Sequence, residues 1–303
     1  MTTPDFHALS IAADDGVRLA ATRVGRPTAA ATLVYVHPLL RERRFWAPIT
    51  TGVHEHLCGA VTQLTYDQRG HGDSQAPHRG EVTTVARLAE DLDTVLTHAS
   101  GSVVLVAHST GAQLVHAYAT THREHAAALA GLVLLNAAPE PPALPRYLRT
   151  WPQRLIRLRR HPALHALTAA GEAALGYRLD HTRRPHLPPS TVDPRARVDV
   201  LAAHSGGFGF FTGVAEAMRH IPSAVLAGEQ DPLVPPQHAV RLADALWADY
   251  DIVAGAGHDL PRTHPARATD TITCTLDHAL RTHLDHASGS TRTPATEPRR
   301  GVR

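Results

Sequence analysis

Short runs of consecutive apolar residues recur along this chain, and polar or glycine-bearing turn residues follow each of them. The runs cover residues 31–36, 61–66, 103–107, 131–135, 223–227 and 250–254. Continuous apolar, β-branched runs are typical of strands that are buried on both faces of a parallel sheet. Amphipathic helical patterns lie between most of them, at residues 82–98, 112–122 and 236–247. This alternation predicts an α/β fold with a mostly parallel central sheet flanked by helices.

Three segments depart from that alternation. Residues 6–24 hold two short alternating patterns around Asp14, Asp15 and Gly16, which predicts an antiparallel hairpin at the start of the sheet. Residues 139–220 contain amphipathic helical segments separated by proline-rich stretches, which predicts a helical insertion. Residues 286–303 cannot bury an apolar face, so we expect a disordered tail. The core is then expected at residues 1–138 and 221–285.

Composition and charge exclude several classes of protein. The formal net charge of +2 is too small to indicate a nucleic-acid partner. The chain has two cysteines, Cys58 and Cys274, which indicate neither a zinc cluster nor a disulfide framework, and we expect both to be buried free thiols. No spacing of residues indicates a cofactor or a metal site. With no secretory leader and no apolar run long enough for a membrane span, a cytoplasmic location is expected.

The buried run that ends at Val106 leads into the segment Ala107-His108-Ser109-Thr110-Gly111, and a helical pattern follows at once. A strand, a small-x-Ser-x-Gly turn and a helix make up a nucleophile elbow, in which a sharp turn projects a strained serine above the sheet. Ala107 stands in place of the usual first glycine. The N-terminus of the following helix favours negative charge that develops beside the serine. Ser109 is therefore the candidate nucleophile.

A serine hydroxyl needs a base to take its proton, and a carboxylate that orients this base. His258 lies in the glycine-bearing segment just past the last predicted strand, at the carboxyl edge of the sheet. Asp231 follows the strand before it. The dipeptide Asp231-Pro232 alone indicates only a turn, but the chain order of serine, aspartate and histidine favours an acid. We expect Ser109, Asp231 and His258 to form a catalytic triad.

Together with two further motifs, these residues resemble the α/β-hydrolase superfamily, specifically its single-domain enzymes with a helical cap. The segment His37-Pro38-Leu39 stands where such enzymes usually carry His-Gly-x after the third strand. The segment from Tyr66 to Ser74, YDQRGHGDS, is similar to their Asp-x-Arg-Gly-x-Gly-x-Ser turn. The resemblance runs from about Asp5 to Leu284. It implies that the insertion at residues 139–220 is a cap that roofs the site.

The resemblance also implies an oxyanion hole, formed by the backbone N–H groups of Leu39 and Thr110. Loss of one such donor typically costs about 3 to 4 kcal/mol of transition-state stabilisation. Pro38 replaces the usual glycine, which reshapes the loop but leaves the donor on the next residue. The other polar residues of the two motifs are expected to brace loops, namely His37, Asp67, Arg69 and His71.

The implied activity is hydrolysis of a carboxylic ester or a related acyl compound, in which water resolves an acyl-enzyme on Ser109. Serine at this position argues against the family's epoxide hydrolases and haloalkane dehalogenases, which use aspartate. Two alternatives stay open. One is a ligand-binding or biosynthetic protein that keeps the fold without hydrolysing its ligand. The other uses the same triad for C–C bond hydrolysis, a lyase reaction or haloperoxidase-type chemistry without a cofactor.

The insertion is rich in large apolar side chains, so we expect a small-molecule acyl substrate of apolar or aromatic character. The candidate pocket residues are Leu40, Tyr147, Trp151, Phe208, Phe210 and Phe211. Ordinary packing within the insertion explains the same side chains equally well. Arginines are also dense there, and a solvated helix face is the favoured interpretation. An anionic ligand or a carrier-protein partner stays open without further support.

Overall fold

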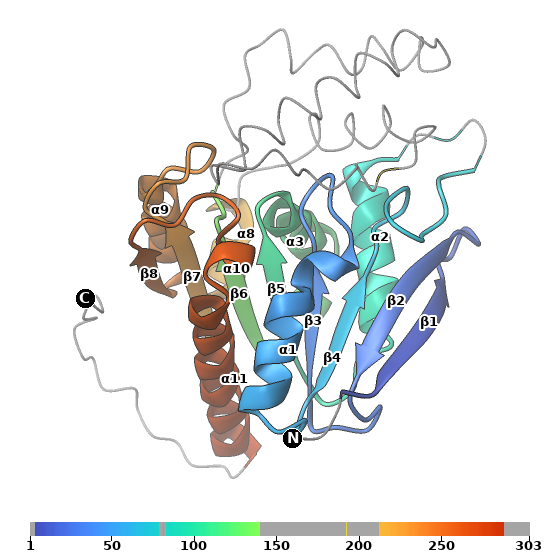
Figure 1. The fold of residues 1–303 in the computed structure, drawn as a ribbon, viewed down its shortest axis with the longest axis horizontal. Helices are drawn as coiled ribbons and strands as arrows, with labels where there is room; N and C mark the ends of the chain where they lie inside the picture. The colour runs from blue at the N-terminus through green and yellow to red at the C-terminus, as the bar shows by residue number, and fades with distance from the viewer. Residues whose placement is uncertain (1–3, 79–80, 82, 140–191, 193–211, 288–303) are drawn as a thin grey trace, which may run out of the picture.

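The computed structural model describes residues 4–78, 81, 83–139, 192 and 212–287. They form a central eight-stranded sheet with helices on both faces (Figure 1). The strands are β1 Phe6–Ala12, β2 Arg18–Val24, β3 Ala31–Val36, β4 Thr62–Tyr66, β5 Ser102–His108, β6 Gly131–Leu135, β7 Ser223–Gly228 and β8 Asp249–Val253. Their spatial order is β1-β2-β4-β3-β5-β6-β7-β8. The predicted α/β fold class is confirmed.

One strand of the described sheet, β2, runs against all the others. It pairs antiparallel with β1 on one side and with β4 on the other, whereas the strands from β4 to β8 are parallel to their neighbours. The turn between β1 and β2 contains Gly16 with a φ of 83°, a conformation that glycine adopts without steric cost. The predicted hairpin is therefore confirmed.

A layer of helices covers each face of the sheet (Figure 1). One layer contains α2 Val85–Leu96, α3 Thr110–Thr121, α4 Arg123–Ala127, α8 Thr212–Met218 and α9 Pro236–Leu246. The other contains η1 Arg43–Trp46, α1 Ala47–His56, α10 Leu260–Thr263 and α11 Pro265–Ala287. Successive side chains of a strand point to opposite faces, so in β3 Val34 and Val36 join the first layer and Leu33 and Tyr35 the second. The central strands are thus buried on both faces.

Helix α11 was not predicted, although its sequence carries a helical signal. Its buried apolar residues are Ala268, Ile272, Leu276 and Ala279. They recur every three or four positions, which places them on one face of a helix that packs against α1 and the sheet. Many polar residues stand between them, so this segment has no continuous apolar run.

Some expectations from the sequence differ from the structure. Cys58 and Cys274 are free thiols, but both are exposed and not buried. Cys58 lies in the turn after α1, and Cys274 lies on the solvent side of α11, away from Ile272 and Leu276. Helix α11 also continues to Ala287, past the predicted start of the tail at residue 286.

Helix α8 falls inside the predicted insertion at residues 139–220, yet it packs into the core. Its residues Val214, Ala215 and Met218 are buried in the same apolar cluster as α3 and α9. We therefore place the second boundary of the proposed insertion before α8, near residue 211. Among the described residues, no helix combines the length and the apolar character needed to cross a membrane.

Candidate active site

Ser109 lies in the tight turn between β5 and α3. Its backbone has a φ of 53° and a ψ of −118°, a conformation that costs a non-glycine residue about 1–3 kcal/mol. Two backbone hydrogen bonds hold the turn: the Ser109 N–H donates to the Leu135 carbonyl at 3.0 Å, and the Ser109 carbonyl accepts from the Ala112 N–H at 3.0 Å. The strain is thus held by the ends of β6 and α3, as a nucleophile elbow requires.

Gly111 lets the start of α3 approach the end of β3 closely. A Cβ at this position would lie 2.5 Å from the carbonyl oxygen of Val36, nearer than side chains come in real proteins. The start of α3 therefore packs directly on the loop after β3. There the backbone N–H of Leu39 donates to Oγ1 of Thr110 at 2.6 Å. The structure brings together the two residues predicted for the oxyanion hole, with one backbone donor already engaged by a side chain.

His258 and Asp231 come from the loops that follow β8 and β7. The His258 Nδ1 lies 2.7 Å from Oδ2 of Asp231. Because a carboxylate can only accept, Nδ1 carries the proton, and Nε2 is left to accept from the Ser109 hydroxyl at 2.9 Å. Gly228 allows the two loops to meet, since a Cβ there would lie 2.5 Å from the carbonyl oxygen of Ala256. Three residues from separate segments thus form one hydrogen-bonded chain.

The carboxylate of Asp231 is buried and saturated with donors. Its Oδ1 accepts from the backbone N–H groups of Leu233 at 2.8 Å and Val234 at 2.9 Å, while Oδ2 accepts from His258 and from Asn136 Nδ2 at 2.7 Å. Burial acts to raise the pKa of Asp231, but the hydrogen bonds from His258, Val234 and Asn136 outweigh it. The pKa of this carboxyl is therefore held below its usual value, and the group is anionic at neutral pH.

Two site residues escaped the sequence analysis in this role, Asn136 and His108. Asn136 follows β6, and its Nδ2 donates both to Asp231 and to the carbonyl of Gly257 at 3.2 Å. His108 ends β5, and its Nε2 donates to the carbonyl of His258 at 2.8 Å. Both are buried polar residues at the carboxyl end of a parallel strand, and this position is the signal that marks them.

Comparisons with known proteins identify the family of this chain. A sequence model of the alpha/beta hydrolase family matches residues 33–271. The chain belongs to this family. The comparison with curated protein sequences found no match.

Solved structures show the same fold at low sequence identity. A thermophilic esterase from Thermogutta terrifontis has 22% identity and a TM-score of 0.67, with 90% of this chain and 99% of that chain covered. A bromoperoxidase from Bacillus anthracis has 19% identity and a TM-score of 0.69, with 89% and 100% covered. An enol-lactonase from Burkholderia xenovorans has 21% identity and a TM-score of 0.68, again with 89% and 100% covered. These likenesses concern the fold.

The loops around the site of this alpha/beta hydrolase are braced by buried polar residues. His37 donates through Nδ1 to the Pro38 carbonyl at 2.9 Å, and its Nε2 accepts from the Gln68 N–H at 3.0 Å. Burial lowers the pKa of His37 to about 4, so the ring is neutral at physiological pH. Further along, Asp67 accepts from Arg43 and from the Asp73 N–H, and Arg69 pairs with Asp91. His71, also buried, forms an isolated bridge with Val192.

Of the predicted pocket residues, the structure describes only Leu40. Leu40 is described, is partly buried and has a φ of 65°. It packs with Leu39, Ala76 and Val192, and Val192 comes from the predicted insertion. The remaining pocket candidates lie outside the described residues, namely Tyr147, Trp151, Phe208, Phe210 and Phe211.

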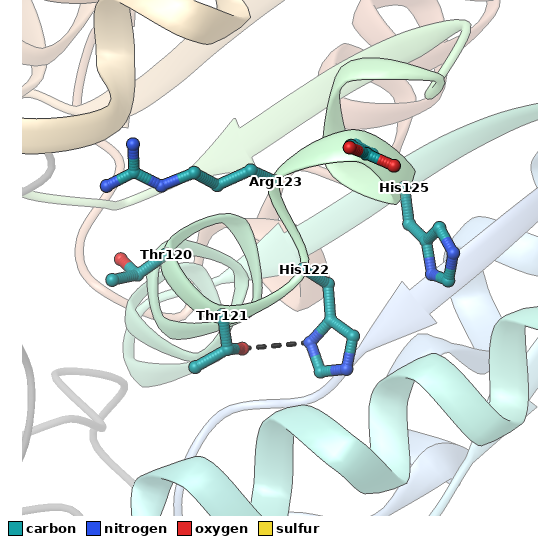
Figure 2. Close-up of a pocket in the computed structure, with 6 residues that line it drawn as sticks. Thr120, Thr121, His122, Arg123 and His125 are labelled. Atoms are coloured by element: carbon teal, nitrogen blue, oxygen red, sulfur yellow. Dashed lines mark hydrogen bonds between the residues drawn. The ribbon is translucent and has the colours of Figure 1, made fainter.

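A surface cavity of about 360 Å³ lies away from this site, where α3 ends and α4 begins (Figure 2). Thr121, His122 and Arg123 are among the residues that line it. Ser109 lies just before the N-terminus of α3, whereas the cavity lies at the C-terminus of this helix. The cavity therefore has no contact with the candidate nucleophile. In the described part of the chain, no three histidine, cysteine, aspartate or glutamate side chains are grouped so that they could hold a metal ion.

Proposed function

We propose that this protein is a serine hydrolase that cleaves a carboxylic ester, or a related acyl compound, through an acyl-enzyme on Ser109. The observation that supports it most is the hydrogen-bonded chain from Ser109 through His258 to Asp231. A neutral imidazole that accepts from a strained serine and donates to an anionic carboxylate is arranged to withdraw the serine proton.

The reaction follows from these contacts. The Ser109 Oγ attacks the acyl carbon while its proton moves to His258 Nε2, and the carbonyl oxygen becomes negatively charged. The tetrahedral intermediate then collapses, the leaving alcohol takes the proton from His258, and the acyl group stays on Ser109. A water molecule repeats these steps and releases the carboxylic acid. Asp231 stays ionised throughout and stabilises the imidazolium.

A small apolar cluster that includes Leu39, one of the two residues predicted for the oxyanion hole, supports an apolar acyl or aromatic substrate. Leu39, Leu40, Ala76 and Val192 pack together there, and Leu39 is hydrogen-bonded to Thr110 beside the candidate nucleophile. Each methylene of a substrate buried against such a cluster contributes roughly 0.8 kcal/mol. We propose that the insertion forms the rest of a substrate pocket as a cap.

The experiment that tests this function is labelling of the purified protein with a fluorophosphonate probe, followed by mapping of the modified residue by mass spectrometry. We expect the label on Ser109, none in Ser109→Ala, and a rate of labelling lower by several orders of magnitude in His258→Ala. His264→Ala is a matched control, because this partly exposed histidine lies close in sequence and outside the hydrogen-bonded chain. It should label like the unmodified protein.

p-Nitrophenyl esters of increasing acyl length are then assayed with the same protein. We expect kcat/KM to rise with acyl length until the pocket is filled. A folded protein that neither labels nor hydrolyses any ester would contradict the proposal and favour the ligand-binding alternative.

A further inference from the structure

The hydroxyl of Thr110 occupies an unexpected place next to the candidate nucleophile. An oxyanion hole built from two backbone donors needs both N–H groups free to reach the substrate oxygen. Here the N–H of Leu39 donates to Thr110 Oγ1 at 2.6 Å. The hydroxyl of Thr110, the residue next to Ser109, therefore occupies this backbone donor in the structure.

The hydroxyl of Thr110 keeps its own hydrogen available. A hydroxyl that accepts one hydrogen bond still holds one O–H donor. Other threonines of this chain use that donor on a carbonyl of the preceding helical turn, as Thr120 does with His116 and Thr121 with Ala117. Thr110 is the first residue of α3 and makes no such bond. Within the described part of the chain, neither its hydroxyl nor its backbone N–H donates to any acceptor.

The geometry around Thr110 is held by buried groups. The close approach at Gly111 presses the start of α3 on the loop after β3. In that loop, the His37 ring donates to the Pro38 carbonyl, and Gln68 Nε2 donates to the His37 carbonyl at 2.6 Å. These contacts keep the Leu39 N–H directed at Thr110 Oγ1. Because all of them are buried, rearrangement of the loop is costly.

We propose that the Thr110 hydroxyl is a direct donor to the substrate carbonyl oxygen, and to the oxyanion formed from it, with the Leu39 N–H polarising it from behind. This inference rests on the hydrolase function proposed above and deepens it. The Thr110 backbone N–H supplies the second donor. A hydroxyl that itself accepts a hydrogen bond is a stronger donor than an isolated one, because hydrogen bonds in a chain polarise each other. No proton is transferred from Thr110, and only its hydrogen bond strengthens as charge develops.

Variants at position 110 test this role through kcat and KM for a p-nitrophenyl ester. Thr110→Val keeps the volume and removes the hydroxyl, and Thr110→Ala also clears the path from the Leu39 N–H to the substrate. We expect both variants to lose kcat by about 100- to 1,000-fold with little change in KM, as is typical when one oxyanion donor is removed. Thr110→Ser should restore most of kcat. Thr120→Val, in the same helix with its hydroxyl bonded to His116, is the control and should keep the activity of the unmodified protein.

Each outcome decides between roles. If Thr110→Ala keeps or gains kcat, the hydroxyl occupies the oxyanion hole of the free protein without donating to the substrate oxygen. That result would overturn the inference. If Thr110→Val does not fold, the comparison of Thr110→Ala with Thr110→Ser carries the same test. Fluorophosphonate labelling of the unmodified protein distinguishes a failure of this inference from a failure of the proposed hydrolase function. A labelled Ser109 with full activity in Thr110→Ala overturns only the role of Thr110, whereas no labelling overturns both.

Discussion

Asn136 links the acid of the candidate triad to the loop that carries the base. Its side-chain amide donates to Asp231 Oδ2 and to the Gly257 carbonyl, one residue before His258. Its backbone has a φ of 47°, in the left-handed region that asparagine tolerates better than most residues. We interpret Asn136 as a positioning residue, which holds the carboxylate in register with the imidazole.

Replacing Asn136 by aspartate should change the pH dependence of catalysis. The new carboxylate would stand within hydrogen-bond distance of Asp231, and two like charges this close raise the pKa of the pair. We expect the acid limb of the kcat/KM profile to move to higher pH. Loss of a hydrogen bond to a charged group, about 1.5–3 kcal/mol, should lower kcat by roughly 10- to 100-fold.

The matched control for this prediction is Asn136→Gly, which accepts the same backbone conformation and adds no charge. It should lower kcat without moving the acid limb. An Asn136→Asp profile that superimposes on that of the unmodified protein would contradict a positioning role.

At the scale of elements, the site depends on how closely helices and loops approach one another. Gly111 brings α3 against the loop after β3, and Gly228 brings the loop of Asp231 against the loop of His258. In both places backbone carbonyls occupy the space that a Cβ would need. These glycines therefore determine distances within the site, although neither contributes a functional group.

Gly111→Ala should destabilise the protein and impair the site, because its Cβ would lie 2.5 Å from the Val36 carbonyl and 3.1 Å from that of His37. Overpacking of this kind costs typically 1–3 kcal/mol. Gly213→Ala in α8 is the comparison, since nothing lies within 4 Å of its Cβ position. An alanine there should be neutral or stabilise by up to about 1 kcal/mol. Urea unfolding measures both, and equal free energies of unfolding for the two variants would refute the argument.

At the scale of the whole molecule, two helical layers bury a polar framework as well as an apolar core. His37 and His108 are buried at the carboxyl ends of β3 and β5, and burial holds the pKa of each below its usual value. For His108, repulsion from a protonated His258 would act in the same direction. Folding therefore requires both rings to stay neutral, which makes the stability of the domain sensitive to mild acid.

The size and sign of this effect can be stated for His37. Its pKa is about 4 in the folded protein, against an ordinary value of 6.5. Between these two values the unfolded chain binds a proton that the native protein does not. Stability is therefore full above pH 6.5 and declines as the pH falls towards 4, by roughly 3 kcal/mol from this residue.

Urea unfolding of the unmodified protein and of His37→Gln at pH 7.5 and pH 4.5 measures the effect. Glutamine can donate and accept but does not titrate, so the variant should lose less stability on acidification. The same loss in both proteins would show that His37 does not contribute.

Much of this structure can be predicted from the sequence. Strands β3 and β6 were predicted with the bounds that the structure has, because a buried strand leaves a local apolar pattern that its own residues carry. Ser109, Asp231 and His258 could be nominated from strand ends and chain order, since a parallel sheet gathers the carboxyl ends of its strands at one edge.

What the tertiary structure alone decided are contacts between segments distant in the chain. The Leu39 N–H meets a hydroxyl 71 residues away, and Asn136 meets Asp231 across 95 residues. Strand order and the close approach of backbones at glycines determine such pairs. A local sequence pattern predicts neither of them. The sequence alone therefore indicated the fold class, the buried central strands and the candidate triad. Only the packed fold decided which donors face which acceptors, because hydrogen bonds depend on distances of a few tenths of an ångström.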